Sequence, residues 1–314
     1  MLPRHGFGAG KGVFFRNLET LAVDARRRVL AFDWLGQGCS DRPGGFPARP
    51  TPLARAEAAS DDQIADGAVA WFTDSLEAWR RRVLPAGAPF TLVAHSVGGF
   101  LAAHYALRHP GAVDKLVLVS PAGVPRHPEG LDDDAVDAAL AAAARPRYAC
   151  FSFGRPLVAL WDYHVTPQSL IRLLGDQSRR ARPVVKHLYR RAGDVPDAFA
   201  DYLYNINALP GSSERVLTTL FKPADRDDAL RGIYARRALV DDPRAPSLPP
   251  TTVLYGERDW MLNGLTERAV ADLGADLVLV PDAGHQIHLE NPEACNAAIL
   301  AAVGSGAARE ARVG

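Results

Sequence analysis

Cysteine is scarce in this sequence, and the few cysteines form no motif. Only three occur among 314 residues, and they are too far apart for a CxxC pair: Cys39, Cys150 and Cys295. This spacing excludes a disulfide framework of the secreted type and favours a reducing compartment. No group of His and Cys residues has metal-ligand spacing, so we predict no metal and no cofactor.

Long apolar runs and net charge are missing as well. The sequence has no run of 18 apolar residues, which argues against a transmembrane helix. Residues 1–12 lack the apolar stretch of a signal peptide. Lys+Arg and Asp+Glu both number 36, so the formal net charge is zero and nucleic acid is a disfavoured partner.

What the chain does have is an alternation of short apolar runs and helical patterns. The predicted strands are 29–32, 90–94, 116–120, 251–255 and 276–280, and the predicted helices are 14–25, 63–83, 99–109, 265–273 and 291–303. This alternation predicts an α/β fold with a mostly parallel sheet and flanking helices. We expect a core of 1–124 and 251–303 and a flexible tail, 304–314. The helix-rich insertion 125–250 is either a cap over the ligand site or a helical domain without a role in chemistry.

One apolar run ends abruptly at a serine. In TLVAHSVGG, Ser96 follows His95 and precedes Val97, Gly98 and a helical pattern. This matches the strand–turn–helix of the G-x-S-x-G motif, with Ala94 as the first small residue, and it exposes a serine hydroxyl at a tight turn. A serine that merely caps a helix is the alternative.

A serine needs a base to take its proton, and the base needs a carboxylate to orient it. Asp259 follows the strand 251–255, and His285 follows the strand 276–280. The order serine, acid, histidine is that of α/β hydrolases. Glu257 and His288 are the alternative acid and base. We predict a triad of Ser96, Asp259 and His285.

An oxyanion hole needs two N–H donors. Val97 follows the serine, and His5-Gly6-Phe7-Gly8 resembles the His-Gly-x loop that supplies the second donor, so Phe7 and Val97 are the candidates. His5, Gly6, Gly8, His95 and Gly98 are expected to support them. The run 6–12 fits neither of the glycine-rich nucleotide-binding motifs.

Several longer segments carry a family resemblance. HGFGAGKGVFFRNL, FDWLGQGCSDRP, VAHSVGGFLAAHYALRHP, LYGERDWM and PDAGHQIHLENPE together resemble the α/β-hydrolase-domain 4/5 (CGI-58-like) family, from residue 5 to about residue 300. VTPQSLIRLLG and YLYNINALPGSSE extend the resemblance into 125–250.

The resemblance implies lipid chemistry. The family includes lysophospholipases, proposed lysophosphatidic acid acyltransferases and a lipase co-activator that lacks the serine. The expected function is hydrolysis of acyl esters of phospholipids or lysophospholipids. The alternatives are a lysophosphatidic acid acyltransferase and a non-catalytic lipid-binding adaptor. Acyltransferase members carry H-x4-D, for which the candidate here is His285 with Glu290, a carboxylate longer by one methylene.

A cluster of basic residues fits such a substrate. Between Arg172 and Arg191 only Asp176 opposes seven cations, and the candidate headgroup-binding residues are Arg179, Arg180, Arg182 and Lys186. The alternative is a solvated helical face. With the resemblance, this pattern predicts a cytoplasmic or membrane-peripheral protein that contacts a membrane or lipid droplet, with the ER and mitochondrion as further candidate locations. The oligomeric state is not indicated.

The start of the chain stands out against this resemblance. In the fold of the family, the His-Gly-x loop follows a third strand, but only four residues precede His5. Four residues that include Pro3 are too few for a buried strand of about five. We therefore expect the first strands to be missing and the chain to be an N-terminally incomplete version of a longer protein.

Overall fold

The computed structural model describes residues 1–23, 28–52, 60–131, 134, 160–173, 178–224 and 232–304. Within these residues the main sheet has five strands in the order β1-β2-β3-β6-β7, and every neighbouring pair is parallel. The strands are β1 (Leu2–Arg4), β2 (Phe90–His95), β3 (Val113–Val119), β6 (Thr251–Gly256) and β7 (Asp276–Val280). A separate antiparallel pair consists of β4 (Phe221–Ala224) and β5 (Gly232–Ala235). The predicted α/β fold with a mostly parallel sheet is confirmed.

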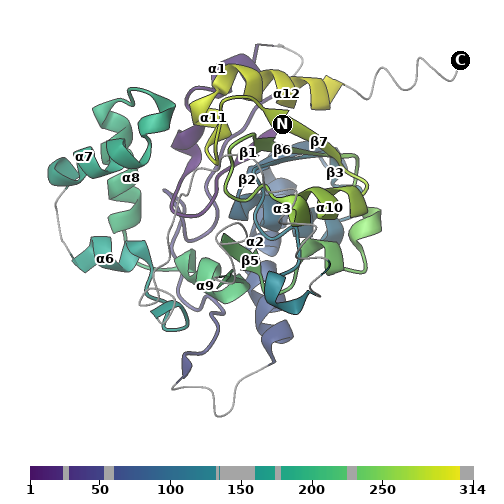
Figure 1. The fold of residues 1–314 in the computed structure, drawn as a ribbon, viewed down its shortest axis with the longest axis horizontal. Coiled ribbons are helices and arrows are strands. Elements are labelled where there is room, and N and C mark those ends of the chain that lie inside the picture. Colours follow the sequence, from purple (N-terminus) through teal and green to yellow (C-terminus); the bar gives the residue numbers. More distant parts are fainter. Residues whose placement is uncertain are drawn as a thin grey trace, which may run out of the picture.

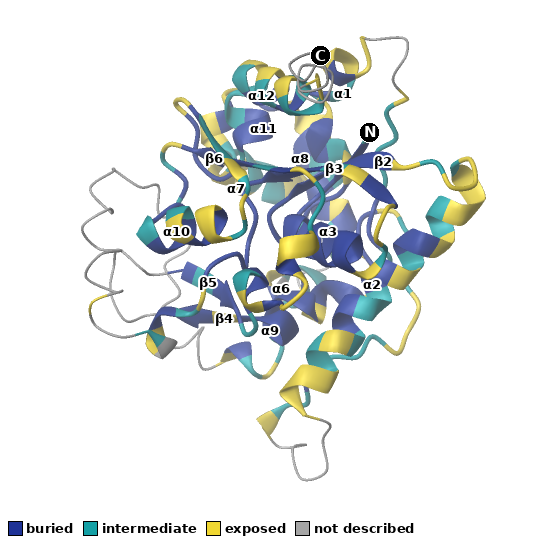
Figure 2. Ribbon diagram, turned by 90° about the vertical axis from the view of Figure 1, so that its right-hand side faces the viewer, coloured by how far each residue is buried: buried dark blue, intermediate teal, exposed yellow. Residues whose placement is uncertain are grey.

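Helices cover both faces of this sheet (Figures 1 and 2). On one face lie α2 (Asp61–Val83), α3 (Val97–Arg108) and α10 (Gly264–Asp272), and on the other lie α1 (Leu18–Leu21), α11 (Ile287–Glu290) and α12 (Pro292–Gly304). Successive strand residues point to opposite faces. Leu92 and Ala94 therefore join the core with α2 and α3, while Val93 joins the core with α12.

Three helices of 125–250 form a lobe beside the sheet (Figure 1): α6 (Pro167–Leu173), α7 (Ser178–Leu188) and α8 (Asp197–Ala208). A fourth, α9 (Val216–Leu220), packs in the main core together with α2. α8 packs on the 3-10 helix η1 (Lys11–Phe14), where Phe199 and Leu203 share a small core with Val13 and Phe14. This contact places the lobe directly against the glycine-rich segment that follows His5. Further 3-10 turns are η3 (Pro128–Gly130), η4 (Arg190–Ala192), η5 (Ser213–Arg215), η6 (Leu239–Asp241) and η7 (Ala245–Ser247).

The expectation for residues 1–4 was wrong. Leu2–Arg4 form β1, all three residues are buried, and they pair in register with Leu92–Ala94 of β2. A further bond to this segment comes from Leu30, whose N–H donates to the carbonyl of Met1 at 3.1 Å. Leu2 also buries its side chain in the core.

Two other predicted elements differ from the structure. The predicted strand 29–32 is extended chain beside Met1 but is not a strand. The predicted helix 14–25 is replaced by η1 and the short α1, while 24–27 lie outside the described residues. Of the expected tail, Gly304 ends α12 and 305–314 lie outside the described residues.

Candidate active site

Ser96 sits at a strained turn between β2 and α3. Its φ is +54° and its ψ is −127°, a combination that residues with a side chain rarely adopt. The turn is held on both sides, because Ser96 N–H donates to Val119 O at 2.9 Å and Ser96 O accepts from Ala122 N–H at 3.1 Å. Gly98 is required here, since an added Cβ would lie 2.2 Å from the carbonyl oxygen of His5. The serine oxygen is therefore fixed at the carboxyl end of the sheet.

The structure brings Ser96, His285 and Asp259 together, although Ser96 and Asp259 are 163 positions apart in the sequence. Ser96 Oγ lies 3.0 Å from His285 Nε2, and His285 Nδ1 lies 3.2 Å from each carboxylate oxygen of Asp259. A second bond fixes the carboxylate, because Met261 N–H donates to Asp259 Oδ1 at 2.9 Å. All three residues are buried. With Nδ1–H donating to the carboxylate, Nε2 is free to accept the serine proton.

The loop that carries His285 is held by two side chains, those of Glu290 and His95. Glu290 accepts hydrogen bonds from the N–H groups of Gly284 at 2.8 Å and Gln286 at 3.2 Å, on either side of the histidine. The ring of His95 donates through Nε2 to the carbonyl of His285 at 2.9 Å. Glu290 therefore supports the histidine loop with both of its oxygens.

The alternative acid and base lie elsewhere. Glu257 is exposed, whereas Asp259 is bonded to His285. His288 is fully buried against Phe14 and His95, and neither of its ring nitrogens has a partner among the described residues. Burial lowers the pKa of His288 to about 3, so its ring is neutral. Burial also lowers the pKa of His95 well below its usual value.

The candidate oxyanion loop passes directly over Ser96. A Cβ added to Gly6 would lie 2.8 Å from Ser96 Cβ, so this backbone is in close contact with the serine. Val97 is the first residue of α3, and its N–H has no acceptor within the helix. Phe7 follows Gly6 in the same loop and packs against the main core. The loop at Gly6 and the start of α3 thus both lie beside Ser96.

A buried polar network that the sequence did not reveal anchors this loop. His5 Nδ1 donates to Gly6 O at 2.8 Å, and its Nε2 accepts from Trp34 N–H at 3.2 Å. Burial lowers the pKa of His5, which agrees with a neutral ring. Asp33 accepts from the N–H groups of Lys11 at 2.5 Å and Cys39 at 2.9 Å. The only local signal for this network is the position of Asp33 directly after an apolar run.

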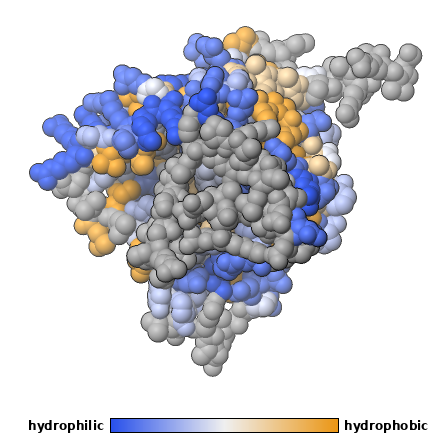
Figure 3. Space-filling model, viewed as in Figure 1, coloured by the Kyte–Doolittle hydropathy of each residue, from blue (hydrophilic) through white to orange (hydrophobic). Residues whose placement is uncertain are grey.

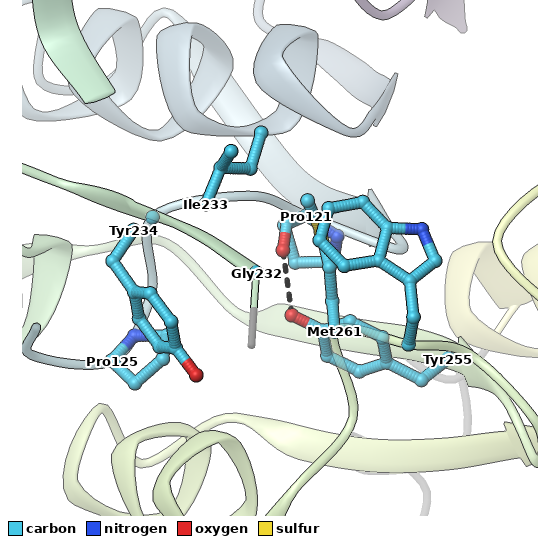
Figure 4. A pocket seen from close by; sticks show the side chains of 9 residues that line it. Pro121, Pro125, Gly232, Ile233, Tyr234, Tyr255 and Met261 are labelled. Carbon is cyan, nitrogen blue, oxygen red and sulfur yellow. Dashed lines mark hydrogen bonds between the residues drawn. The ribbon is translucent and has the colours of Figure 1, made fainter. Parts of the chain in front are cut away.

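An apolar pocket opens on the β3 and β6 side of Ser96 (Figure 4). It is partly open to solvent, and its walls include Ile233, Tyr234 and Met261. Tyr255 closes the base by donating its hydroxyl to Pro121 O at 2.6 Å. Trp260 belongs to the same wall, and its ring centroid lies 5.3 Å from that of His285. The pocket therefore adjoins the histidine.

The basic cluster on α7 is less basic in space than in sequence. Arg182 makes a bidentate ion pair with Asp201, and Lys186 lies 2.6 Å from a carboxylate oxygen of Asp197, both acids being on α8. Arg179 and Arg180 are exposed and form no ion pair among the described residues. Two of the four candidate headgroup residues are thus neutralised by acids of the neighbouring helix. A count of charges along residues 172–191 could not include these acids.

The class of α/β hydrolases is defined by a parallel sheet with helices on both faces and by three residues at the ends of its strands. These are a serine on a strand–turn–helix and an aspartate and a histidine on loops that follow later strands. This chain has all of these features. The model of the alpha/beta hydrolase fold family matches residues 4–292, and the chain belongs to this family.

The relatives agree with the predicted resemblance. A 1-acylglycerol-3-phosphate O-acyltransferase of Arabidopsis thaliana is 32% identical over 94% of this chain and 64% of its own length. A human (lyso)-N-acylphosphatidylethanolamine lipase is 28% identical over 94% of this chain and 76% of its own length. The chain thus spans less than two thirds of the plant relative. Among solved structures, E-2-(acetamidomethylene)succinate hydrolase is similar with a TM-score of 0.54 and 17% identity over 96% of this chain and 90% of that one, which supports the fold alone.

Proposed function

We propose that the protein is a serine hydrolase of acyl esters of phospholipids or lysophospholipids. The single observation that carries this proposal is the continuous contact from Ser96 Oγ through the His285 ring to the Asp259 carboxylate. The lipid class is supported by the names of the lipase and acyltransferase relatives.

The first half of the reaction forms an acyl-enzyme. Ser96 Oγ attacks the acyl carbonyl carbon while His285 Nε2 takes the hydroxyl proton, and Asp259 stabilises the resulting imidazolium. The N–H groups of Phe7 and Val97 donate to the oxyanion. The C–O bond to the leaving alcohol then breaks, and His285 returns the proton to that alcohol.

The second half decides between hydrolysis and acyl transfer. His285 deprotonates either a water molecule or the hydroxyl of a lysolipid, which attacks the acyl-enzyme and releases Ser96. Hydrolysis is the main proposal, and acyl transfer is supported by the name of the plant relative. Glu290 acts in either case by holding the His285 loop, since both its oxygens accept from the backbone there.

We further propose that 125–250 is a cap over this site. Its support is the packing of α8 on η1 and the bond from Gly12 N–H to Tyr202 Oη at 3.1 Å. A helical domain without influence on the site would not explain these contacts.

Labelling with a fluorophosphonate tests the proposal. We expect covalent modification of the folded protein at Ser96 and none in Ser96→Ala, while Ser75→Ala on α2 serves as a control that labels like the wild type. A folded wild-type protein that is not labelled would favour the adaptor function. A panel of phospholipids and lysophospholipids, scored for free fatty acid and for transacylated lipid, then separates hydrolysis from acyl transfer.

A further inference from the structure

A polar pocket lies on the other side of Ser96 from the apolar one. Three separate segments form it: the loop at Gly8, the turn from Gly36 to Arg42, and the cap residues Gln168, Arg172 and Glu214. It is partly open to solvent.

The position of this pocket relative to the serine follows from the sheet order. The Gly8 loop follows β1, whereas Pro121 and Met261 of the apolar pocket follow β3 and β6, and β2 with Ser96 lies between them. Gly8 is two residues from Gly6, at most about 7.6 Å along the chain. Gly6 itself contacts Ser96. The distance suits a group a few bonds from the reacting ester.

The charges that line the pocket leave one positive charge in excess among the described residues. Arg172 donates to Glu214 Oε1 at 2.6 Å and so forms one balanced pair. Arg42 has no such carboxylate partner. Its two terminal nitrogens donate to four carbonyls, those of Gly36, Gly38, Ile206 and Pro210, which do not neutralise its charge. Its Nε is buried without a partner among the described residues. Asp33 lies behind the same turn, where it is bonded to backbone N–H groups.

One wall residue lacks a partner. Gln168 is 6% exposed, and its buried Oε1 accepts no hydrogen bond from any described residue. A buried carbonyl oxygen without a donor is costly, so a bound hydroxyl would be favoured at this point.

We propose that this pocket binds the glycerophosphate end of the substrate, with the phosphoryl group hydrogen-bonded to Arg172, the charge of Arg42 attracting it through space, and a glycerol hydroxyl donating to Gln168. This inference rests on the proposed function. Guanidinium groups bind phosphate through charge-assisted hydrogen bonds. Glu214 pairs with Arg172 until the phosphate replaces that carboxylate.

The experiment measures binding without catalysis. The Ser96→Ala protein is titrated by calorimetry with glycerol 3-phosphate, inorganic phosphate and glycerol. We expect glycerol 3-phosphate to bind more tightly than inorganic phosphate, and Gln168→Leu to remove that difference. Equal binding of the two anions by Ser96→Ala would mean a site for free phosphate and would overturn the lipid assignment.

Two opposite substitutions distinguish binding from a structural role. Arg172→Gln should weaken glycerol 3-phosphate binding at least about tenfold, because a charge-assisted bond is lost. Glu214→Gln should strengthen it, because the competing carboxylate disappears. A purely structural ion pair would lose affinity in both variants, and that result would overturn the proposal. Arg108→Gln and Asp74→Asn, which break a surface pair of α3 and α2, are the matched controls.

Failure of this inference differs from failure of the proposed function. If fluorophosphonate labels Ser96 but Ser96→Ala binds no glycerol 3-phosphate, the hydrolase stands and the phosphate site is wrong. With active protein, the ratio of kcat/KM for a lysophosphatidic acid to that for the monoacylglycerol of the same chain length should fall at least about tenfold in Arg172→Gln. An unchanged ratio contradicts the proposal.

Discussion

Glu290 holds the backbone on both sides of His285, with one carboxylate oxygen 2.8 Å from Gly284 N and the other 3.2 Å from Gln286 N. The carboxylate therefore positions the histidine loop without touching the histidine ring.

Replacing Glu290 tests this positioning role. We expect Glu290→Ala to lower kcat about tenfold with little change in KM, because the loop loses two charge-assisted bonds and His285 shifts from Ser96. Glu290→Gln keeps one acceptor and should retain most of the activity. Measured kcat and KM decide the matter, and a change in KM alone would contradict the role.

The same position bears on acyl transfer. Glu290→Asp creates the H-x4-D spacing, but the shorter side chain should keep only one of the two backbone bonds. We expect lower total turnover and an unchanged ratio of transacylated lipid to free fatty acid. A rise in that ratio would show that the carboxylate acts on the acceptor.

Gly98 tests the close contact between the helix start and the His5 loop. Gly98→Ala places a Cβ 2.2 Å from His5 O, where the backbone must move. We expect a loss of about 1–3 kcal/mol in the free energy of unfolding and slow fluorophosphonate labelling. Urea denaturation gives the first and a labelling time course the second. Gly44→Ala, with nothing within 4 Å, is the control and should leave both unchanged.

The buried neutral ring of His288 predicts a pH dependence of stability. Its pKa is about 3 in the folded protein and about 6.5 in the unfolded chain. Between these values the unfolded state binds the extra proton, so stability falls as pH decreases from about 6.5, by up to about 1.4 kcal/mol per pH unit for this histidine. The pKa of the neighbouring His95 is lowered in the same direction.

Urea denaturation of His288→Leu between pH 4 and 7 measures this slope. We expect a smaller loss of stability toward low pH than in the wild type. His187→Gln, which removes an exposed histidine, should leave the slope as it is. Equal slopes in all three proteins would show that His288 is not the group that titrates.

The exposed apolar residues at the ends of α6 and α7 predict contact with a lipid surface. Leu173 is 82% exposed and Leu188 is 61% exposed. Both are close in sequence to Arg179 and Arg180, which form no ion pair within the described part of the chain. Figure 3 shows apolar side chains among hydrophilic ones on this side of the molecule. We expect Leu173→Ser with Leu188→Ser to weaken binding to anionic phospholipid vesicles at least about tenfold, from the apolar area lost. The thermal midpoint should not change.

Vesicle co-sedimentation measures this binding. Val23→Ser, 78% exposed but on the α1 side of the molecule, is the matched control and should bind like the wild type. Equal binding by all three proteins would exclude this surface as the lipid contact. No helix among the described residues is long and apolar enough to cross a membrane.

The positions of Ser96, Asp259 and His285 were predictable because each follows a strand of a parallel sheet, and the ends of such strands meet at one edge. The sequence also indicated β2, β3, β6 and β7, because buried strands read as apolar runs. It could not show that Leu2–Arg4 form a strand, since that depends on pairing with β2. Nor could it show that Arg182 on α7 pairs with Asp201 on α8. These are contacts between distant segments, which no local pattern encodes.

Arg42 joins two parts of the molecule that the chain itself keeps far apart. Its guanidinium bonds the turn at Gly36 and Gly38 to the carbonyls of Ile206 and Pro210 at the end of α8. Moving either segment away would leave N–H groups of the charged Arg42 side chain without acceptors. These two segments should therefore fluctuate as one cooperative unit and exchange their amide hydrogens together. We therefore expect the end of α8 to move least when the site widens.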